Sequence, residues 1–250
     1  MKIDVVLTPH DVKLPKPSAT CVVVDVLRAS SSIITALQNG CAAIYPITEP
    51  PEAFPLADGT DILACGERGG VKIPGYHLGN SPAEFSREAV SGKRLVMCTT
   101  NGTRAIRAGA AHGRAFIGCF LNATAVASRL MQVGQDITII CAGRKKSFSI
   151  EDTLCAGMIV SELDGEMTDA AVASATIFEA YHDRIGEILQ ESEHGRFLQR
   201  IGFADDIGYC SRVAIFDIVP EVFPSDEPAP HDVVIRSAFD RESFHGGSND

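Results

Sequence analysis

Three segments of the chain place an arginine just after a short apolar run, where a strand is expected to end and a helix to begin. They are "VVVDVLRASSS" (22–32) with Arg28, "LVMCTTNGTRA" (95–105) with Arg104, and "TIICAGRKKSFSIED" (138–152) with Arg144. A helix start carries partial positive charge, so a basic residue there is mildly unfavourable unless an anion lies between the two. Together the three arginines predict a site for a small anion, although each alone could be a solvated residue or the partner of a carboxylate.

The same turns offer further donors. Asn101, Gly102 and Thr103 form the second turn, and Gly143 lies in the third. Backbone N–H groups exposed at Gly102, Thr103 and Gly143 would point toward an anion bound at the helix starts. We expect these four residues to bind the anionic substrate of such a site.

Carboxylates accompany the arginines. Asp25 follows a run of apolar residues, where an unpaired charge would be costly, so it needs a metal ion or an arginine as partner, and a simple pair with Arg28 is the alternative. Asp152 lies three residues after Ser149, the spacing of a capping box, and could serve only to cap a helix. Glu151 has no such structural explanation.

A fourth segment, "CGERGGVKIPGYHLGNSPAEF" (65–85), is rich in glycine and holds Glu67 and Arg68 between two of its glycines. A loop with this backbone freedom often carries function. Beside three turns suited to an anion, it is expected to form part of the same pocket.

Cys98 and Arg104 have the spacing of a cysteine-dependent phosphatase loop, in which a thiolate attacks phosphorus and the arginine holds the oxyanion. The hydroxyl residue that usually follows this arginine is absent, because position 105 is Ala. This metal-independent mechanism is one alternative. A non-catalytic protein that binds an organic phosphate or sulfonate is another, but carboxylates among the arginines would weaken pure anion binding.

Apolar, β-branched runs recur along the chain with helical segments between them. Strands are expected at residues 21–26, 41–47, 61–65, 94–98, 114–119, 136–142 and 212–219, and helices at 31–39, 102–110, 121–132, 150–162 and 168–200, the last broken near Gly186 and Gly195. Strands that are apolar throughout are typical of a mainly parallel sheet covered by helices on both faces. The pattern predicts a layered α/β fold, with the three turns at the carboxyl edge of the sheet.

The composition changes after Pro220. The stretch "PEVFPSDEPAP" and the tail "ESFHGGSND" indicate coil, with at most one edge strand in "DVVIRSAF" (232–239). We therefore expect one α/β domain over residues 1–220, with two subdomains as an alternative, and a partly irregular C-terminal extension over 221–250.

The 250 residues have the composition of an ordinary globular protein, 45% hydrophobic and 22% charged. A net charge of −10 argues against nucleic acid, which requires a basic surface. No apolar stretch approaches the roughly 20 residues that span a bilayer, and the first residues are too short and polar a stretch for a secretory signal. The eight cysteines include no Cys-x-x-Cys pair. We therefore expect a cytoplasmic protein with reduced cysteines that binds neither nucleic acid nor membrane.

Four motifs, in this order and spacing, resemble those of the 2-phosphosulfolactate phosphatase family: "VVVDVLRASSSI", "GERGGVKIPGYHLGNSP", "TTNGTRA" and "CAGRKKSFSIEDTLCAG". The resemblance covers about residues 3–220 and implies a three-layer α/β/α fold with a mainly parallel sheet. It also implies a magnesium-dependent phosphohydrolase that converts 2-phospho-3-sulfolactate into sulfolactate and phosphate, a step of coenzyme M biosynthesis. Because many bacteria have relatives without making coenzyme M, a similar small anionic phosphate ester remains an alternative substrate.

The resemblance also implies roles for residues inside the motifs. The cationic ones, expected to bind phosphate, sulfonate and carboxylate groups, are Arg28, Arg68, Arg104 and Arg144. The acidic ones, expected as ligands of Mg²⁺, are Asp25, Glu67, Glu151 and Asp152. Asp25, Glu151 and Arg28 are the expected catalytic residues, with Asp25 or Glu151 as general base. Which carboxylate binds metal and which moves the proton is left open, as is the oligomeric state, for which a two-fold homodimer is the commonest arrangement.

Overall fold

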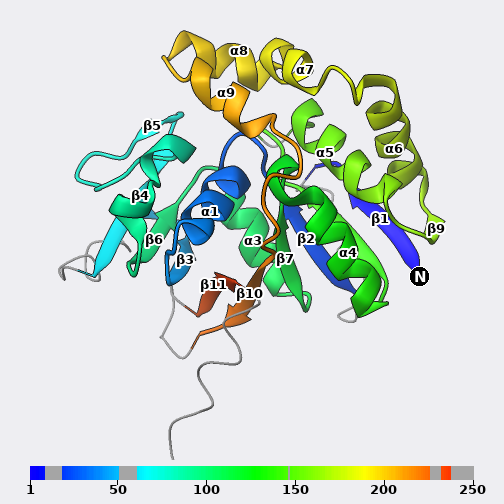
Figure 1. Ribbon diagram of the computed structural model, residues 1–250, viewed down its shortest axis with the longest axis horizontal. Coiled ribbons are helices and arrows are strands. Elements are labelled where there is room, and N and C mark those ends of the chain that lie inside the picture. Colours follow the sequence, from blue (N-terminus) through cyan, green and yellow to red (C-terminus); the bar gives the residue numbers. More distant parts are fainter. Residues whose placement is uncertain (9–18, 51–60, 146, 226–231, 238–250) are drawn as a thin grey trace, which may run out of the picture.

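The computed structural model of the chain describes residues 1–8, 19–50, 61–145, 147–225 and 232–237 (Figure 1). Its strands are β1 (Lys2–Val6), β2 (Thr20–Val24), β3 (Ala43–Ile47), β4 (Ile62–Arg68), β5 (Val71–Lys72), β6 (Arg94–Cys98), β7 (Ala115–Gly118), β8 (Ile137–Cys141), β9 (Glu166–Met167), β10 (Pro220–Pro224) and β11 (Val233–Ser237). Its helices are α1 (Ala29–Gln38), α2 (Arg87–Val90), α3 (Gly102–Ala110), α4 (Ala123–Val133), α5 (Ile150–Ser161), α6 (Asp169–Tyr181), α7 (Ile185–Glu191), α8 (Glu193–Arg200) and α9 (Ala204–Cys210), with short 3₁₀ turns at Pro82–Glu84 and Phe120–Asn122.

The centre of the sheet is covered on both faces, as its unbroken apolar runs predict. Val22 and Val23 are neighbours in β2, both are fully buried, and their side chains point to opposite faces. On one face the sheet is covered by α3, whose Gly109 packs closely against Val23. On the other face it is covered by α5: Gly118 of β7 lies against Val22 and against Ile159 of that helix. The predicted three-layer α/β/α fold is confirmed.

The sheet has the strand order β5-β4-β6-β3-β11-β10-β7-β2-β8-β1-β9. One parallel group contains β4, β6 and β3, and the other contains β7, β2, β8, β1 and β9. The antiparallel hairpin of β10 and β11 joins the two groups, because β10 pairs with β7 and β11 with β3. Figure 1 shows this hairpin at the bottom of the view, between the two groups.

The C-terminal part differs from the prediction. Residues 212–219 are not a strand, because the N–H groups of Ala214 and Phe216 donate to the carbonyls of Phe120 and Leu121 in a 3₁₀ turn. Pro220–Pro224, expected as coil, is β10, and β11 lies inside the sheet and not at its edge. The other parts of the expected extension, residues 226–231 and 238–250, lie outside the described residues, and the domain division at residue 220 stays a prediction.

The sequence pattern also fails to indicate several short elements, namely β1, β5, α2, β9 and α9. The helical segment 168–200 is broken, as predicted, but its breaks fall after Tyr181 and at Ser192. Ser192 caps α8 by accepting a hydrogen bond from the N–H of Gly195. A Cβ on Gly195 would lie 1.8 Å from the carbonyl oxygen of Leu189, so this glycine permits α8 to pack against α7.

Two helices connect the parallel groups. α1 leads from β2 to β3, and α3 leads from β6 to β7, so each begins beside a different group. Their first turns meet: a Cβ on Gly102 would lie 2.5 Å from the Cβ of Ala29 and 2.7 Å from Oδ2 of Asp25. Only glycine allows this approach, and it brings two of the predicted turns to one place.

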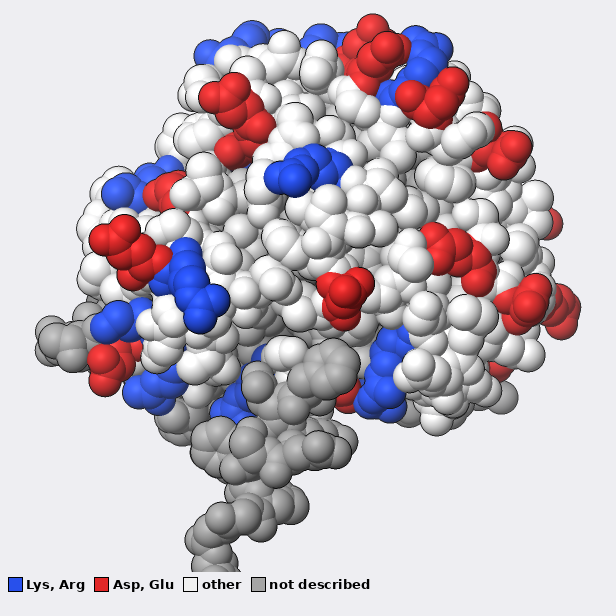
Figure 2. Space-filling model, viewed as in Figure 1, with Lys and Arg blue, Asp and Glu red and all other residues white. Residues whose placement is uncertain are grey.

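Acidic and basic side chains are interspersed over the face of the molecule in Figure 2. No helix within the described ranges is long and apolar enough to cross a membrane.

Candidate active site

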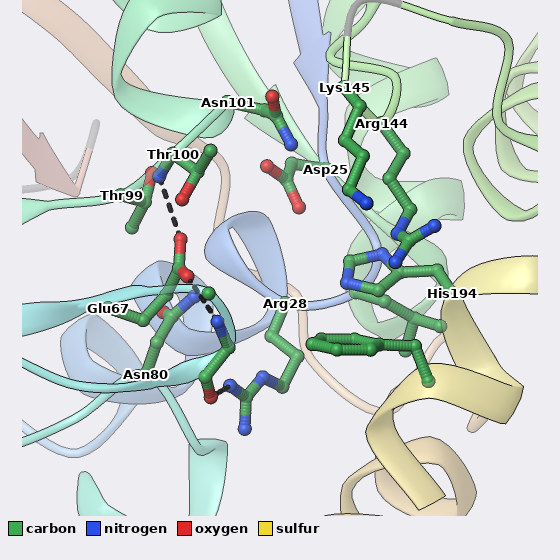
Figure 3. A pocket seen from close by; sticks show the side chains of 14 residues that line it. Asp25, Arg28, Glu67, Asn80, Thr99, Thr100, Asn101, Arg144, Lys145 and His194 are labelled. Atoms are coloured by element: carbon green, nitrogen blue, oxygen red, sulfur yellow. Dashed lines mark hydrogen bonds between the residues drawn. The ribbon is translucent and has the colours of Figure 1, made fainter. Parts of the chain in front are cut away.

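A pocket that is open to solvent lies where α1 and α3 begin (Figure 3). The loops after β4 and β8 and the first turns of α8 complete its wall. Its lining residues are Asp25, Leu27, Arg28, Glu67, Gly69, Gly70, Asn80, Thr99, Thr100, Asn101, Arg144, Lys145, His194 and Phe197. The pocket therefore joins all four segments that the sequence predicts to share a site.

Asp25 is the central carboxylate of the pocket. Its Oδ1 accepts a hydrogen bond of 3.2 Å from the N–H of Ala29 at the start of α1. No hydrogen-bond donor to Oδ2 is found among the described residues. Gly102, which has no side chain, leaves room for this oxygen. Burial raises the pKa of Asp25 to about 6, opposed by the charge of His194 and the bond from Ala29 and supported by the charges of Glu67 and Glu151.

Glu67 and Asn80 form the opposite wall from Arg144 and Lys145 (Figure 3). The carboxylate of Glu67 accepts hydrogen bonds from the N–H of Thr100 at 2.7 Å and from that of Gly70 at 2.8 Å. These bonds fix its orientation but leave lone pairs on both oxygens. Oδ1 of Asn80 is buried and has no hydrogen-bond partner, a condition that normally calls for a ligand, an ion or a water.

These oxygens fit a magnesium ion in part. Mg²⁺ prefers oxygen ligands and is usually held by one or two carboxylates together with water and substrate phosphate. Asp25, Glu67 and the orphaned oxygen of Asn80 match that description. However, the described residues contain no group of three or more His, Cys, Asp or Glu side chains placed to hold a metal ion, so the four expected carboxylates do not form a cage.

Asp152 and Glu151 have other partners. Asp152 is buried and accepts hydrogen bonds from the N–H of Val26 at 2.8 Å and of Gly143 at 3.0 Å, which ties two of the turns together. Burial and the charges of Asp25 and Glu151 raise its pKa well above the ordinary value. Burial alone would raise the pKa of Glu151 too, but the hydrogen bond and charge of His194, whose Nδ1 lies 3.3 Å away, hold it below the ordinary value.

Arg28 lines the pocket, but its guanidinium is directed to other partners. Nη1 pairs with Asp206 of α9 and Nη2 donates to the carbonyl of Gly70, both at 2.6 Å. The same group lies 4.2 Å from the ring centre of Phe203. Arg28 and Asp206 are both buried, so Arg28 holds the pocket loop at Gly70 in place, and its ion pair is with Asp206 and not with Asp25.

The basic wall of the pocket consists of Arg144, Lys145 and His194. Arg144 forms an ion pair with the exposed Glu193 and lies 5.0 Å from the ring centre of Phe197. These three side chains also line a second, adjoining hollow beside Glu151.

Several expected substrate contacts are not formed as predicted. Arg68 lies outside the pocket lining, because alternate residues of β4 face opposite ways, and its guanidinium donates to the carbonyl of Thr48 and to Sγ of Cys98. The side chain of Arg104 is 62% exposed and lies 3.7 Å from Glu49. The N–H of Thr103 is bonded to the hydroxyl of Thr99.

Two glycines also have roles other than the expected ones. The N–H of Gly143 is bonded to Asp152, and Gly102 provides room for Asp25. Of the residues predicted to bind substrate, Asn101 and Arg144 line the pocket.

Cys98 does not have the surroundings of a nucleophile. It is fully buried at the end of β6 and lies outside the pocket lining, whereas Arg104 points to Glu49. A thiolate and an oxyanion clamp would have to face one phosphoryl group. The geometry therefore opposes the cysteine mechanism.

Comparison with known proteins identifies the family. The model of the family described as 2-phosphosulpholactate phosphatase matches residues 6–223. The chain belongs to the 2-phosphosulfolactate phosphatase family. The resemblance found in the four motifs is thereby confirmed.

Several members of this phosphatase family are similar to the chain over most of their length. A protein of Symbiobacterium thermophilum is 42% identical over 207 residues, which are 80% of this chain and 89% of the relative. One of Pseudothermotoga lettingae is 41% identical over 225 residues, 90% and 96% of the two chains, and one of Clostridium novyi is 37% identical over 228 residues, 88% and 97%. All three are named "Probable 2-phosphosulfolactate phosphatase".

Three polar residues of the pocket lining are not among those predicted from the sequence, namely Asn80, Lys145 and His194. Asn80 and Lys145 lie inside the matching motifs, and their polar side chains are a signal that could have found them. His194 comes from α8, in a segment that is indistinguishable from any surface helix until the fold brings it to Glu151.

Arg144→Ala and Arg104→Ala should have different effects. Arg144→Ala removes a cation from the pocket wall and is expected to raise KM about tenfold or more. Arg104→Ala removes an exposed side chain and should leave kcat/KM near the wild-type value. Steady-state phosphate release by both variants checks this, and an equal loss in the two would contradict the placement of Arg104 outside the site.

Proposed function

We propose that this protein hydrolyses 2-phospho-3-sulfolactate, or a similar small anionic phosphate ester, to the alcohol and inorganic phosphate with the help of Mg²⁺. The observation that carries the proposal is the pocket itself, in which Asp25 and Glu67 face Arg144, Lys145 and His194. A pure anion-binding site gains nothing from the two carboxylates. A phosphatase uses both carboxylates and basic side chains. The names of the relatives support hydrolysis of a phosphate ester.

Asp25 is the proposed general base. Of the two candidate carboxylates, Glu151 is bonded to His194 and lies outside the pocket lining, whereas Asp25 lines it and has Oδ2 directed to the space beside Gly102. A pKa near 6 suits a group that must accept a proton from water near neutral pH. The basic wall of Arg144, Lys145 and His194 then binds anionic groups of the substrate and holds it in the pocket.

Glu67 and Asn80, beside Asp25, are the residues proposed to hold Mg²⁺. When bound, the ion would polarise the phosphoryl group and activate water. The hydrogen bonds from Thr100 and Gly70 keep Glu67 in place for this role. Asp152 is not proposed as a ligand, because both of its oxygens accept buried backbone N–H groups.

We also propose a cytoplasmic location, supported by eight buried cysteines that are all free thiols. A role in coenzyme M biosynthesis and a two-fold dimer stay predictions.

The decisive experiment measures phosphate release from 2-phospho-3-sulfolactate and from a panel of phosphomonoesters, in Mg²⁺ and in EDTA. Turnover should require Mg²⁺ and stop in EDTA, and Cys98→Ser should keep the wild-type rate. Full activity in EDTA would contradict the metal proposal, and inactivity of Cys98→Ser would restore the cysteine mechanism. Tight anion binding without turnover of any ester would favour the binding-protein alternative.

A second readout does not depend on activity. Ligands that bind only the folded state raise its stability. Mg²⁺ should therefore raise the melting temperature of the wild type, and Glu67→Gln should remove this increase. An equal increase in both would remove Glu67 from the proposed ligands.

A further inference from the structure

Lys145 has an unusual backbone conformation. The turn that contains it is closed by two hydrogen bonds between Arg144 and Ser147, of 3.0 and 2.8 Å. Lys145 has a φ of 48°, in the left-handed region that favours glycine and asparagine. Non-glycine residues held there cluster at functional sites, because the conformation is otherwise unfavourable. The position therefore has a lysine where the backbone alone would favour another residue.

The side chain of Lys145 is directed into the pocket. Figure 3 shows it next to Arg144, with its amino group facing the space in front of Asp25. Arg144 is paired with Glu193 and His194 with Glu151. Within the described ranges no hydrogen bond or ion pair to the Lys145 amino group is found, so it is the cation of this wall that has no acidic partner there.

The two walls of the pocket differ in charge. Glu67 and Asn80, the proposed metal-holding residues, are on one side, and the cationic Arg144 and Lys145 are on the other, next to His194. A substrate whose phosphoryl group lies toward Glu67 extends the rest of its carbon chain toward Lys145. An anionic group at that end would find an ammonium group already facing it.

We propose that Lys145 binds the second anionic group of the substrate, a sulfonate or carboxylate, and thereby selects phosphate esters that carry such a group over uncharged ones. This inference rests on the proposed phosphatase function and assigns the orientation of the substrate within the pocket. Lys145 is in this view a specificity-determining residue, while the phosphoryl group is bound on the opposite side.

The test compares Lys145→Gly with the wild type on two esters. Glycine suits a positive φ, so the variant should fold at least as well. For 2-phospho-3-sulfolactate we expect KM to rise about tenfold or more with kcat nearly unchanged. For glycerol 2-phosphate, which has no second anion, kcat/KM should stay near the wild-type value. Lys145→Arg should recover part of the lost affinity, and Lys72→Ala, a lysine outside the pocket lining, should change neither ester.

An equal loss on both esters would show that Lys145 contacts the phosphoryl group and would overturn the proposal, as would no loss on either. Failure of the proposed function has a different signature, which is no turnover of any ester by the wild type. In that case calorimetric binding of sulfolactate decides the inference by itself: Lys145→Gly should bind it about tenfold or more weakly, and equal affinity would contradict the role of Lys145.

Discussion

Asp25→Asn is expected to lower kcat for phosphate release about 10²- to 10⁴-fold while the protein stays folded. Asparagine has nearly the same shape, and its side-chain oxygen can still accept the hydrogen bond from Ala29. It cannot accept a proton from water. Steady-state kinetics with saturating Mg²⁺ measure the effect, and Asp164→Asn, an exposed aspartate elsewhere, is the matched control. A variant that keeps most of its kcat would remove Asp25 from the role of base.

The same substitution should change the pH dependence of stability. Burial raises the pKa of Asp25 from 3.8 to about 6 in the folded state. Below about pH 4 the carboxyl is neutral, and its contribution to the free energy of unfolding has its full value. This contribution to stability is lost as the pH rises through about 6. Asparagine does not ionise. In EDTA, the free energy of unfolding of Asp25→Asn relative to that of the wild type should therefore increase by roughly 2–3 kcal/mol between pH 4 and pH 7. Urea unfolding at the two pH values measures this, and a constant difference would contradict it.

Arg28→Met is expected to reduce the free energy of unfolding by about 3–5 kcal/mol. The substitution leaves Asp206 buried without its cation and the carbonyl of Gly70 without its donor. It also removes the contact with the ring of Phe203. Because the loop at Gly70 lines the pocket, kcat/KM should fall as well.

The control for Arg28 separates a buried ion pair from an exposed one. Arg184 pairs with Glu187 at the surface, and Arg184→Ala should leave stability unchanged within error. Adding Asp206→Asn to Arg28→Met should recover part of the lost stability, because the buried charge is then removed. If Arg28→Met were as harmless as Arg184→Ala, the buried pair would not be what holds the loop.

The layered fold is predictable because burial on both faces leaves a strong local pattern. Val22 and Val23 must both be apolar, since α5 lies on one side of β2 and α3 on the other. The hairpin of β10 and β11 has a weaker signal. β10 contains two prolines and a glutamate, which are typical of coil, and the short apolar run of β11 indicates no more than an edge strand. Its place inside the sheet depends on β3 and β7, which are far away in the sequence.

The candidate site is predictable in its location and less so in its details. The turns at Asp25, Asn101 and Arg144 do meet, and Glu67 joins them. The three arginines have equivalent places in the sequence pattern, but Arg28 stabilises the pocket loop, Arg104 faces solvent and Arg144 faces the pocket. Sequence spacing places an arginine at a helix start and does not specify where its long side chain points.

The α/β layers, the four segments that form the site and the family are all predictable from the sequence, because each leaves a pattern within a few tens of residues. The tertiary structure alone decided which charged groups are available to a ligand. Arg28 is taken up by Asp206, 178 residues away, and Asp152 by Val26, 126 residues away. A buried charge must find a partner, and that partner can come from any segment the fold brings near. Only after these pairings are known can Asp25 and Glu67 be assigned as carboxylates, and Arg144 and Lys145 as cations, that line the pocket.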